Sequence, residues 1–304
     1  MVVQGRNGRI EGTYTALVTP FLEDEGQSID WPAFDALVDD QIDGGVDGLV
    51  PCGTTGESPT LTSTEQVALV RRAVARAKGR VGVVAGTGTN ATASTIERSR
   101  EAERAGADAV MAVVPYYNRP TQEGLHRHFV VVAASVSCPV VIYNVPGRSV
   151  ADLLPDTLAR ICDTAKNVVA VKDATGNVLR AQELVRRFGD RLSILSGDDA
   201  LTLPMLSVGA RGVISVTSNL LPKDVARLVT LALDGRFHEV RDLHLSLLPV
   251  HEVMFIESNP APVKAALAMA GKMKDGVRGP LAPASEGAKD RIRSVLDAYK
   301  ARGT

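Results

Sequence analysis

Short runs of apolar residues, rich in Val and Ile, recur along the 304-residue chain and alternate with stretches of helical periodicity. In the stretch Glu65–Lys78, for example, the apolar residues fall on one face of a helix. Apolar runs separated by amphipathic helices indicate a parallel sheet that is covered by helices. The runs predicted as strands are Thr13–Phe21, Gly48–Gly53, Val81–Gly88, Ala109–Tyr117, Pro139–Gly147, Val168–Gly176, Leu192–Asp199 and Gly212–Asn219.

A weak internal repeat sharpens this prediction. The segments GVDGLV, GADAVM and GARGVI each place a glycine where a helix ends and apolar residues where the next strand begins. Eight such units over about 220 residues fit a (β/α)8 barrel better than a doubly wound sheet. We therefore predict an α/β fold, a TIM barrel over residues 1–233, followed by a C-terminal helical domain over residues 234–304. The helices expected there are Phe237–Leu248, Pro262–Ala270 and Glu286–Ala301.

Composition and charge narrow the class of function. The formal net charge is −1 and no block of Lys and Arg stands out, which argues against a nucleic-acid-binding protein. The longest apolar stretch, Phe129–Val145, is interrupted by Ser135, Ser137 and Pro139, so it predicts a helix, a turn and a strand and no membrane span. The 3 cysteines lie far apart, and no signal peptide is evident. Both features suit a cytoplasmic protein with reduced thiols.

One lysine stands in the middle of an apolar run, VVAVKDATG, which spans Val168–Gly176. A buried charge without a partner is costly, and Asp173 is a poor partner because adjacent strand residues point to opposite faces. If Lys172 faces the barrel interior, desolvation lowers its pKa and leaves more neutral amine near pH 7. A neutral amine is the form that attacks a ketone to make a Schiff base. We therefore favour a catalytic role for Lys172 over a buried ion pair.

Other candidates stand where predicted strands end, which is where TIM barrels carry their chemistry. The segment GTTGES, Gly53–Ser58, is either a tight turn or a turn whose N–H groups bind a carboxylate. It lacks the GK[ST] ending of a nucleotide P-loop. Tyr117 and Tyr143 are either ordinary core residues or functional ones. Arg148 is either a solvated loop residue or a bidentate clamp for a substrate carboxylate.

Two further motifs carry weaker signals. GTGTNA, Gly86–Ala91, follows a predicted strand and resembles a dinucleotide fingerprint, but it lies in the third of eight equal units. SGDD, Ser196–Asp199, suggests either a metal site or, more simply, an Asp N-cap for the helix that follows. The sequence contains no HExxH motif and no Cys/His cluster. We therefore expect neither a metal ion nor a nucleotide cofactor.

Seven motifs occur in one order along the chain: GTTGES, PYYNRP, YNVPGR, VKDATG, SGDD, GVISV and NPAPVK. Together they resemble the dihydrodipicolinate synthase/N-acetylneuraminate lyase family of pyruvate-dependent class I aldolases, from about Thr13 to the C-terminal helices. The resemblance implies a covalent Schiff base between Lys172 and pyruvate, with no other cofactor. The arginine of YNVPGR implies the branch that condenses pyruvate with L-aspartate-4-semialdehyde in diaminopimelate and lysine biosynthesis. Sialic acid lyases and keto-deoxy sugar acid aldolases, which usually lack that arginine, are the alternative.

The resemblance also implies a role for each matching residue. Lys172 would form the Schiff base, and Tyr143, Tyr117 and Thr54 would relay the protons that imine and enamine formation must move. The substrate-binding positions would be Thr55 for the carboxylate of pyruvate, Arg148 for the carboxylate of aspartate semialdehyde, and Gly197 and Ile214 for the wall of the pyruvate pocket.

The same resemblance implies partners and regulation. Tyr117 matches a tyrosine that family members insert into the active site of a neighbouring subunit, which implies a homo-oligomer, usually a tetramer built as a dimer of dimers. Members that lysine inhibits carry a histidine, a second polar residue and a glutamate where this chain has Ser63, Gln66 and Ser94. A bound lysine would lose its carboxylate partner at Ser94, so we expect weak or absent inhibition. A non-catalytic, keto-acid-binding barrel is the hypothesis from a different class.

Overall fold

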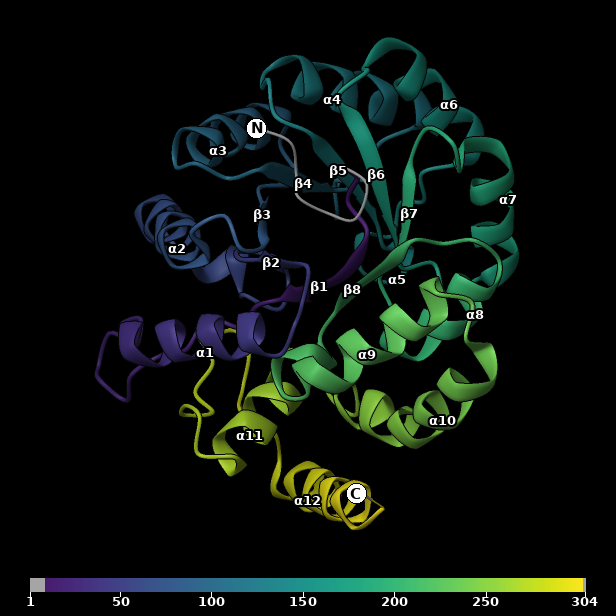
Figure 1. Cartoon of the computed structure of the whole chain (residues 1–304). Coiled ribbons are helices and arrows are strands. Elements are labelled where there is room, and N and C mark those ends of the chain that lie inside the picture. The colour runs from purple at the N-terminus through teal and green to yellow at the C-terminus, as the bar shows by residue number, and fades with distance from the viewer. Residues whose placement is uncertain (1–8, 303–304) are drawn as a thin grey trace.

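Eight parallel strands close into one barrel in the computed structural model, which describes residues 9–302 (Figure 1). The strands are β1 Gly12–Ala16, β2 Gly48–Val50, β3 Gly82–Gly86, β4 Ala109–Val113, β5 Val140–Asn144, β6 Val168–Asp173, β7 Ser193–Ser196 and β8 Gly212–Ser215. Each strand pairs with the next one, and β8 pairs with β1. The predicted TIM barrel is confirmed, and the strands are shorter than predicted because the apolar runs continue into the loops that follow them.

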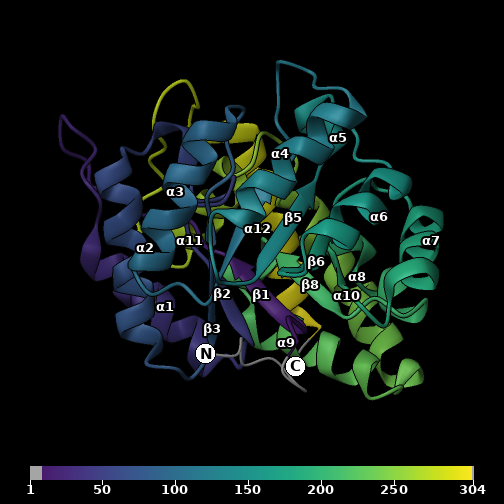
Figure 2. The same ribbon diagram turned by 90° about the horizontal axis from the view of Figure 1, so that it is seen from above.

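Helices form a layer around the barrel (Figures 1 and 2). The helix predicted at Glu65–Lys78 begins two residues earlier, where Thr62 caps it by accepting the N–H of Glu65 at 3.2 Å. The helices are α1 Trp31–Asp43, α2 Ser63–Ala77, α3 Thr92–Arg104, α4 Gln122–Ala134, α5 Pro146–Ser149, α6 Pro155–Thr164, α7 Val178–Phe188, α8 Thr202–Ser207, α9 Pro222–Leu233, α10 Phe237–Val253, α11 Ala261–Met269 and α12 Glu286–Ala301, with 3-10 turns η2 Ser58–Thr60, η3 Asp199–Leu201 and η4 Thr217–Asn219.

The buried apolar residues form separate clusters inside the barrel and between the strands and the helices. Alternate strand residues divide between the two, because successive side chains of a strand point to opposite faces. Ile142 and Val171 belong to the outer cluster, whereas Tyr143 belongs to the inner one. Lys172 follows Val171 on β6 and therefore points into the barrel.

The C-terminal helices cover one side of the ring. α10 packs against α9, and α11 and α12 lie beyond α1 and α9 in Figure 1. The helix predicted as Phe237–Leu248 continues past Pro249 to Val253, because Val250 and Val253 bury their side chains in the core. The boundary predicted after residue 233 stays a prediction, and residues 1–8 and 303–304 of the two predicted domains lie outside the described residues.

The apolar stretch Phe129–Val145 divides as expected. α4 ends at Ala134 and β5 begins at Val140, so a turn separates a helix from a strand. None of the helices described between residues 9 and 302 combines the length and the hydrophobicity that a membrane span requires.

Candidate active site

Lys172 lies inside the barrel on β6, with only 6% of its surface exposed. Its Nζ is 4.3 Å from the centre of the ring of Tyr143, the residue beside it on β5. Within residues 9–302, no carboxylate forms an ion pair with this amine. Burial lowers the pKa of Lys172 to about 8, the charge of Asp199 opposes that shift, and the charge of Arg148 adds to it. The amine is therefore partly neutral near pH 7, as a nucleophile requires.

Asp173 turns away from Lys172, as predicted. Its Oδ1 accepts the backbone N–H and the hydroxyl of Thr175, at 2.8 and 2.7 Å. Burial raises the pKa of Asp173. Asp173 therefore binds Thr175, whereas the neighbouring Lys172 points into the barrel. The interpretation of Lys172 as half of an ion pair with Asp173 is wrong.

Tyr143 and Thr54 connect the lysine to the turn after β2. Tyr143 is 6% exposed. Burial raises its pKa, while the charge of Arg148 and the side chain of Thr54 oppose that rise. The phenol therefore keeps its proton near neutral pH, and the ring that carries it lies beside the amine of Lys172.

The GTTGES segment is a tight turn with free donors. The N–H of Gly56 and that of Ser58 donate to the carbonyl of Gly53 at 3.1 and 3.3 Å, and the N–H of Glu57 donates to the carbonyl of Thr54 at 3.0 Å. The backbone N–H groups of Thr54 and Thr55 have no acceptor within residues 9–302. A carboxylate could take those donors, so the two interpretations of this segment are compatible.

Gly197 and Ile214 also lie at the inner end of the site. A Cβ atom on Gly197 would lie 3.0 Å from Cε of Lys172 and 2.7 Å from Cβ of Ala174, so a larger residue would displace the lysine. Ile214 is 1% exposed and belongs to the cluster inside the barrel. Both residues therefore help to fix the space around the amine.

Arg148 and Tyr117 lie farther out, at the mouth of the barrel. Arg148 is on α5, which lies at one end of the barrel in Figure 2. Tyr117 has a φ of 73° and is 86% exposed in the single chain. Both residues line, together with Thr54, a cavity of about 350 Å³. The structure thus groups the predicted residues into an inner set around Lys172 and an outer set around this cavity.

Asp199 is a residue that the sequence did not single out. The predicted Asp N-cap is confirmed at Asp198, which accepts the N–H of Ala200 at 3.0 Å. The carboxylate of Asp199 is buried and accepts the hydroxyl of Ser215 at 2.5 Å and the N–H of Val216 at 2.8 Å. Asp199 therefore fixes the end of β8, and its charge raises the pKa of Lys172. Asp199 is the last residue of the SGDD motif, but the residues that it binds, Ser215 and Val216, belong to another motif, GVISV.

Strand packing explains the glycines of GTGTNA. A Cβ atom on Gly86 would lie 2.3 Å from the carbonyl oxygen of Cys52, and one on Gly88 would lie 2.3 Å from the nitrogen of Val113. Only glycine allows neighbouring backbone to approach so closely. The dinucleotide interpretation is therefore not needed to account for this motif.

Comparison with known proteins decides the family. The sequence model of the dihydrodipicolinate synthetase family matches residues 9–299. The chain belongs to this family. It is 56% identical over 293 residues to the 4-hydroxy-tetrahydrodipicolinate synthase of Sorangium cellulosum (strain So ce56), a match that covers 96% of this chain and 97% of the relative. The corresponding protein of Geotalea daltonii is 48% identical over 290 residues, covering 95% of this chain and 99% of the relative.

The solved structures agree with the sequence matches. The 4-hydroxy-tetrahydrodipicolinate synthase from Methylacidiphilum fumariolicum SolV has a TM-score of 0.94 at 47% identity, and the match covers 97% of both chains. The predicted family resemblance is thereby confirmed. The chain is an enzyme, a lyase of the aldolase type found in this family.

Proposed function

We propose that the enzyme condenses pyruvate with L-aspartate-4-semialdehyde and releases 4-hydroxy-tetrahydrodipicolinate. The observation that carries this proposal is the buried amine of Lys172, which has no ion-pair partner within residues 9–302 and a pKa lowered to about 8. The names of the relatives support the same reaction. Arg148, at the cavity outside the barrel, supplies the cation that a second carboxylate substrate needs.

The first half of the reaction takes place at Lys172. Its Nζ bonds to the ketone carbon of pyruvate, and the ketone oxygen leaves as water, which gives an imine. Thr55 and the turn around it hold the carboxylate of pyruvate, while Gly197 and Ile214 form the wall of its pocket. Loss of a methyl proton then converts the imine into an enamine. Tyr143, Thr54 and Tyr117 pass these protons between the reacting atoms and solvent.

The second half uses the outer cavity. Arg148 binds the carboxylate of L-aspartate-4-semialdehyde and directs its aldehyde toward the enamine. The enamine carbon bonds to the aldehyde carbon, and the aldehyde oxygen takes up a proton. The amino group of the same substrate then bonds to the imine carbon, and Lys172 leaves as a free amine. The imine nitrogen takes up the electron pair left by the methyl proton and returns it when the enamine carbon attacks the aldehyde, so the proposed mechanism uses neither a metal ion nor an organic cofactor.

The assembly and location also belong to the proposal. The exposed ring of Tyr117 would enter the active site of a neighbouring subunit, in a dimer that pairs into a tetramer. Sedimentation of the wild type tests this assembly, and a monomer with full activity would contradict it. A cytoplasmic location and a place in diaminopimelate and lysine biosynthesis complete the proposed function, and the three free cysteines suit that location.

The substrate is tested with Arg148→Ala. Because hydrogen bonds to a charged group are strong, we expect the KM for L-aspartate-4-semialdehyde to rise about tenfold to a hundredfold. Arg186→Ala, which removes an exposed arginine outside the cavity, is the matched control and should leave the KM unchanged. Cleavage of N-acetylneuraminate or of a keto-deoxy sugar acid by the wild type, with no condensation, would favour the alternative aldolase.

Weak inhibition by L-lysine is a separate prediction. Gln66 is only 6% exposed, and its Nε2 donates to the carbonyl of Ser58 at 2.9 Å, so it is not free to bind a ligand. Ser94 offers no carboxylate to the ammonium group of lysine. Titration of L-lysine into the condensation assay should leave activity nearly unchanged, and Ser94→Glu should increase the inhibition. Half-inhibition of the wild type below millimolar lysine would contradict this prediction.

A further inference from the structure

A buried ion pair joins the C-terminal region to the turn that carries Thr54 and Thr55. The Nζ of Lys264, on α11, lies 2.6 Å from Oε1 of Glu57, and both side chains are 0% exposed. The second oxygen of Glu57 accepts the backbone N–H of Arg278 at 2.9 Å. Both oxygens of this carboxylate are therefore bound by residues of the C-terminal region.

A second buried contact reaches the same turn. The Nδ2 of Asn259 donates to the hydroxyl oxygen of Thr55 at 3.0 Å. Asn259 is 5% exposed and Thr55 is 3% exposed. A hydroxyl that accepts one hydrogen bond keeps its own proton to donate. Asn259 therefore orients the hydroxyl of Thr55 and leaves its proton for another acceptor.

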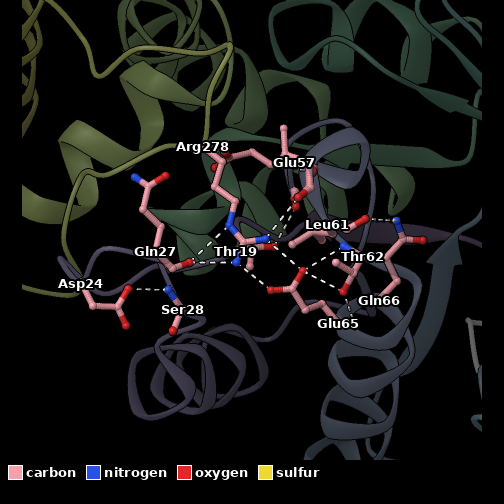
Figure 3. Close-up of polar contacts among 12 residues, drawn as sticks. Thr19, Asp24, Gln27, Ser28, Glu57, Leu61, Thr62, Glu65, Gln66 and Arg278 are labelled. Carbon is pink, nitrogen blue, oxygen red and sulfur yellow. Dashed lines mark hydrogen bonds and ion pairs between the residues drawn. The ribbon is translucent and has the colours of Figure 1, made fainter.

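Arg278 contacts Glu57, Glu65 and Gln27, as Figure 3 shows. Its guanidinium donates to the carboxylate of Glu65 at 2.6 Å and to the carbonyl of Gln27 at 2.8 Å. The ring of Phe21 lies 4.3 Å from Nζ of Lys264 and 4.4 Å from Cζ of Arg278. The two residues that bind Glu57, Lys264 through its ammonium group and Arg278 through its backbone N–H, are thus themselves held in place.

The ion pair of Glu57 and Lys264 fixes the relative position of its partners more than it increases the net stability of the fold. Desolvation of two charges offsets most of their attraction, and apolar pairs of the same size are often as stable. A buried ion pair does, however, require one relative position of its partners. Glu57 has a φ of 58°, a left-handed backbone that few residues other than glycine adopt readily. The contacts to Lys264 and Arg278 hold the turn in this conformation.

We propose that Glu57, Lys264 and Asn259 are positioning residues, which aim Thr54 and Thr55 at the bound keto acid. The inference rests on the proposed function, in which Thr55 binds the carboxylate of pyruvate and Thr54 contacts Tyr143. The N–H of Glu57 donates to the carbonyl of Thr54 at 3.0 Å, so a shift of Glu57 moves Thr54 and, through the chain, its neighbour Thr55. The C-terminal region thereby forms part of the active site, although none of its residues touches the reacting atoms.

A double-mutant cycle tests the contact of Asn259. Asn259→Ala and Thr55→Val should each raise the KM for pyruvate by roughly tenfold or more, since small misplacements near the chemistry have large effects. Because Asn259 acts through Thr55, the double variant should be no worse than Thr55→Val alone. An unchanged KM in Asn259→Ala, or effects that multiply in the double variant, would overturn the proposal.

A second pair of substitutions separates positioning from stability. Glu57→Gln combined with Lys264→Met removes both charges and keeps the size of the side chains, so the protein should melt near the wild-type temperature. The kcat/KM for pyruvate should nevertheless fall about tenfold or more. Lys272→Met breaks an ion pair to Asp40, which joins the same C-terminal region to α1, and should leave kcat/KM unchanged.

The outcomes distinguish this inference from the proposed function. If borohydride traps no pyruvate on the wild type, the proposed function fails. If borohydride traps pyruvate on the wild type, and traps it on the folded Glu57→Gln/Lys264→Met variant at the same pyruvate concentration and rate, only the positioning role fails. If the Glu57→Gln/Lys264→Met variant does not fold, the KM values of the Asn259→Ala and Thr55→Val variants decide.

Discussion

Two lysines of this enzyme are buried and lie over an aromatic ring, yet their surroundings differ. Lys172 lies inside the barrel, 4.3 Å from the ring centre of Tyr143, and has no ion-pair partner within residues 9–302. Lys264 lies 4.3 Å from the ring centre of Phe21 and binds Glu57 at 2.6 Å. Both side chains stand in apolar runs of the sequence, so the sequence signal is the same. The partner decides whether a buried lysine is a nucleophile or a fixed cation.

Burial has the same cost for both lysines, the desolvation of a charged amine, but its consequence differs between them. Burial lowers the pKa of both lysines. At Lys172 no carboxylate forms an ion pair with the amine, so the shift yields neutral amine near pH 7. At Lys264 the carboxylate of Glu57 opposes the shift and favours the charged form. The first arrangement makes an amine reactive, and the second uses a charge to fix the position of a turn.

The largest expected effect is on activity. Lys172→Met should lower kcat by about a thousandfold or more and abolish the pyruvate adduct, because no other lysine of residues 9–302 lies inside the barrel. Lys264→Met should still form the adduct on Lys172, although at higher pyruvate concentrations. The measurement is steady-state kinetics with adduct mass for both variants. Equal loss of the adduct in both variants would contradict the assignment of Lys172 alone as the nucleophile.

The effect on stability should have the opposite order. Lys264→Met leaves the charge of Glu57 buried and unpaired, which should lower the free energy of unfolding by about 3–5 kcal/mol. Lys172→Met removes a buried amine without an ion-pair partner, so its free energy of unfolding should equal or exceed the wild-type value. Denaturant unfolding of both variants checks this. A larger loss for Lys172→Met than for Lys264→Met would contradict the assignment.

The smallest effect is a shift of the pH profile. Only the neutral amine attacks pyruvate, so the rate of Schiff-base formation should rise with pH and level off above a pKa of about 8. Asp199→Asn removes a charge that raises this pKa, so the profile should move to lower pH. Arg148→Ala removes a charge that lowers the pKa, so the profile should move to higher pH.

Rapid-mixing measurements of pyruvate binding give these profiles without the second substrate. Arg186→Ala is the control, because its charge is not among those that shift the pKa of Lys172. Shifts of the same sign in Asp199→Asn and Arg148→Ala would show that another group sets the profile.

The barrel could be predicted because its signal is local. Each apolar run predicted one strand. The predicted strands end too late where the run continues into a loop, as at Thr13–Phe21, and four of them begin one residue away from the observed start. Lys172 could be singled out because a lone charge in a strand is visible within nine residues, Val168–Gly176.

The other buried charges could not be assigned in this way. Lys264 pairs with Glu57 across 207 positions of the chain, and Asp199 binds Ser215 across 16 positions. No periodicity connects such residues, since only the closed barrel and the docked C-terminal helices bring them together. Lys264 stood in a motif used for the family resemblance, NPAPVK, but without its partner it carried no predicted role.

The most direct test is to incubate the enzyme with pyruvate, reduce it with borohydride, and map the modified lysine by mass spectrometry. We expect one pyruvate-sized adduct per chain, on the peptide that contains Lys172, and none on the peptide that contains Lys264. An adduct on Lys264, or a folded protein with no adduct, would show that the lysine without an ion-pair partner is not the nucleophile.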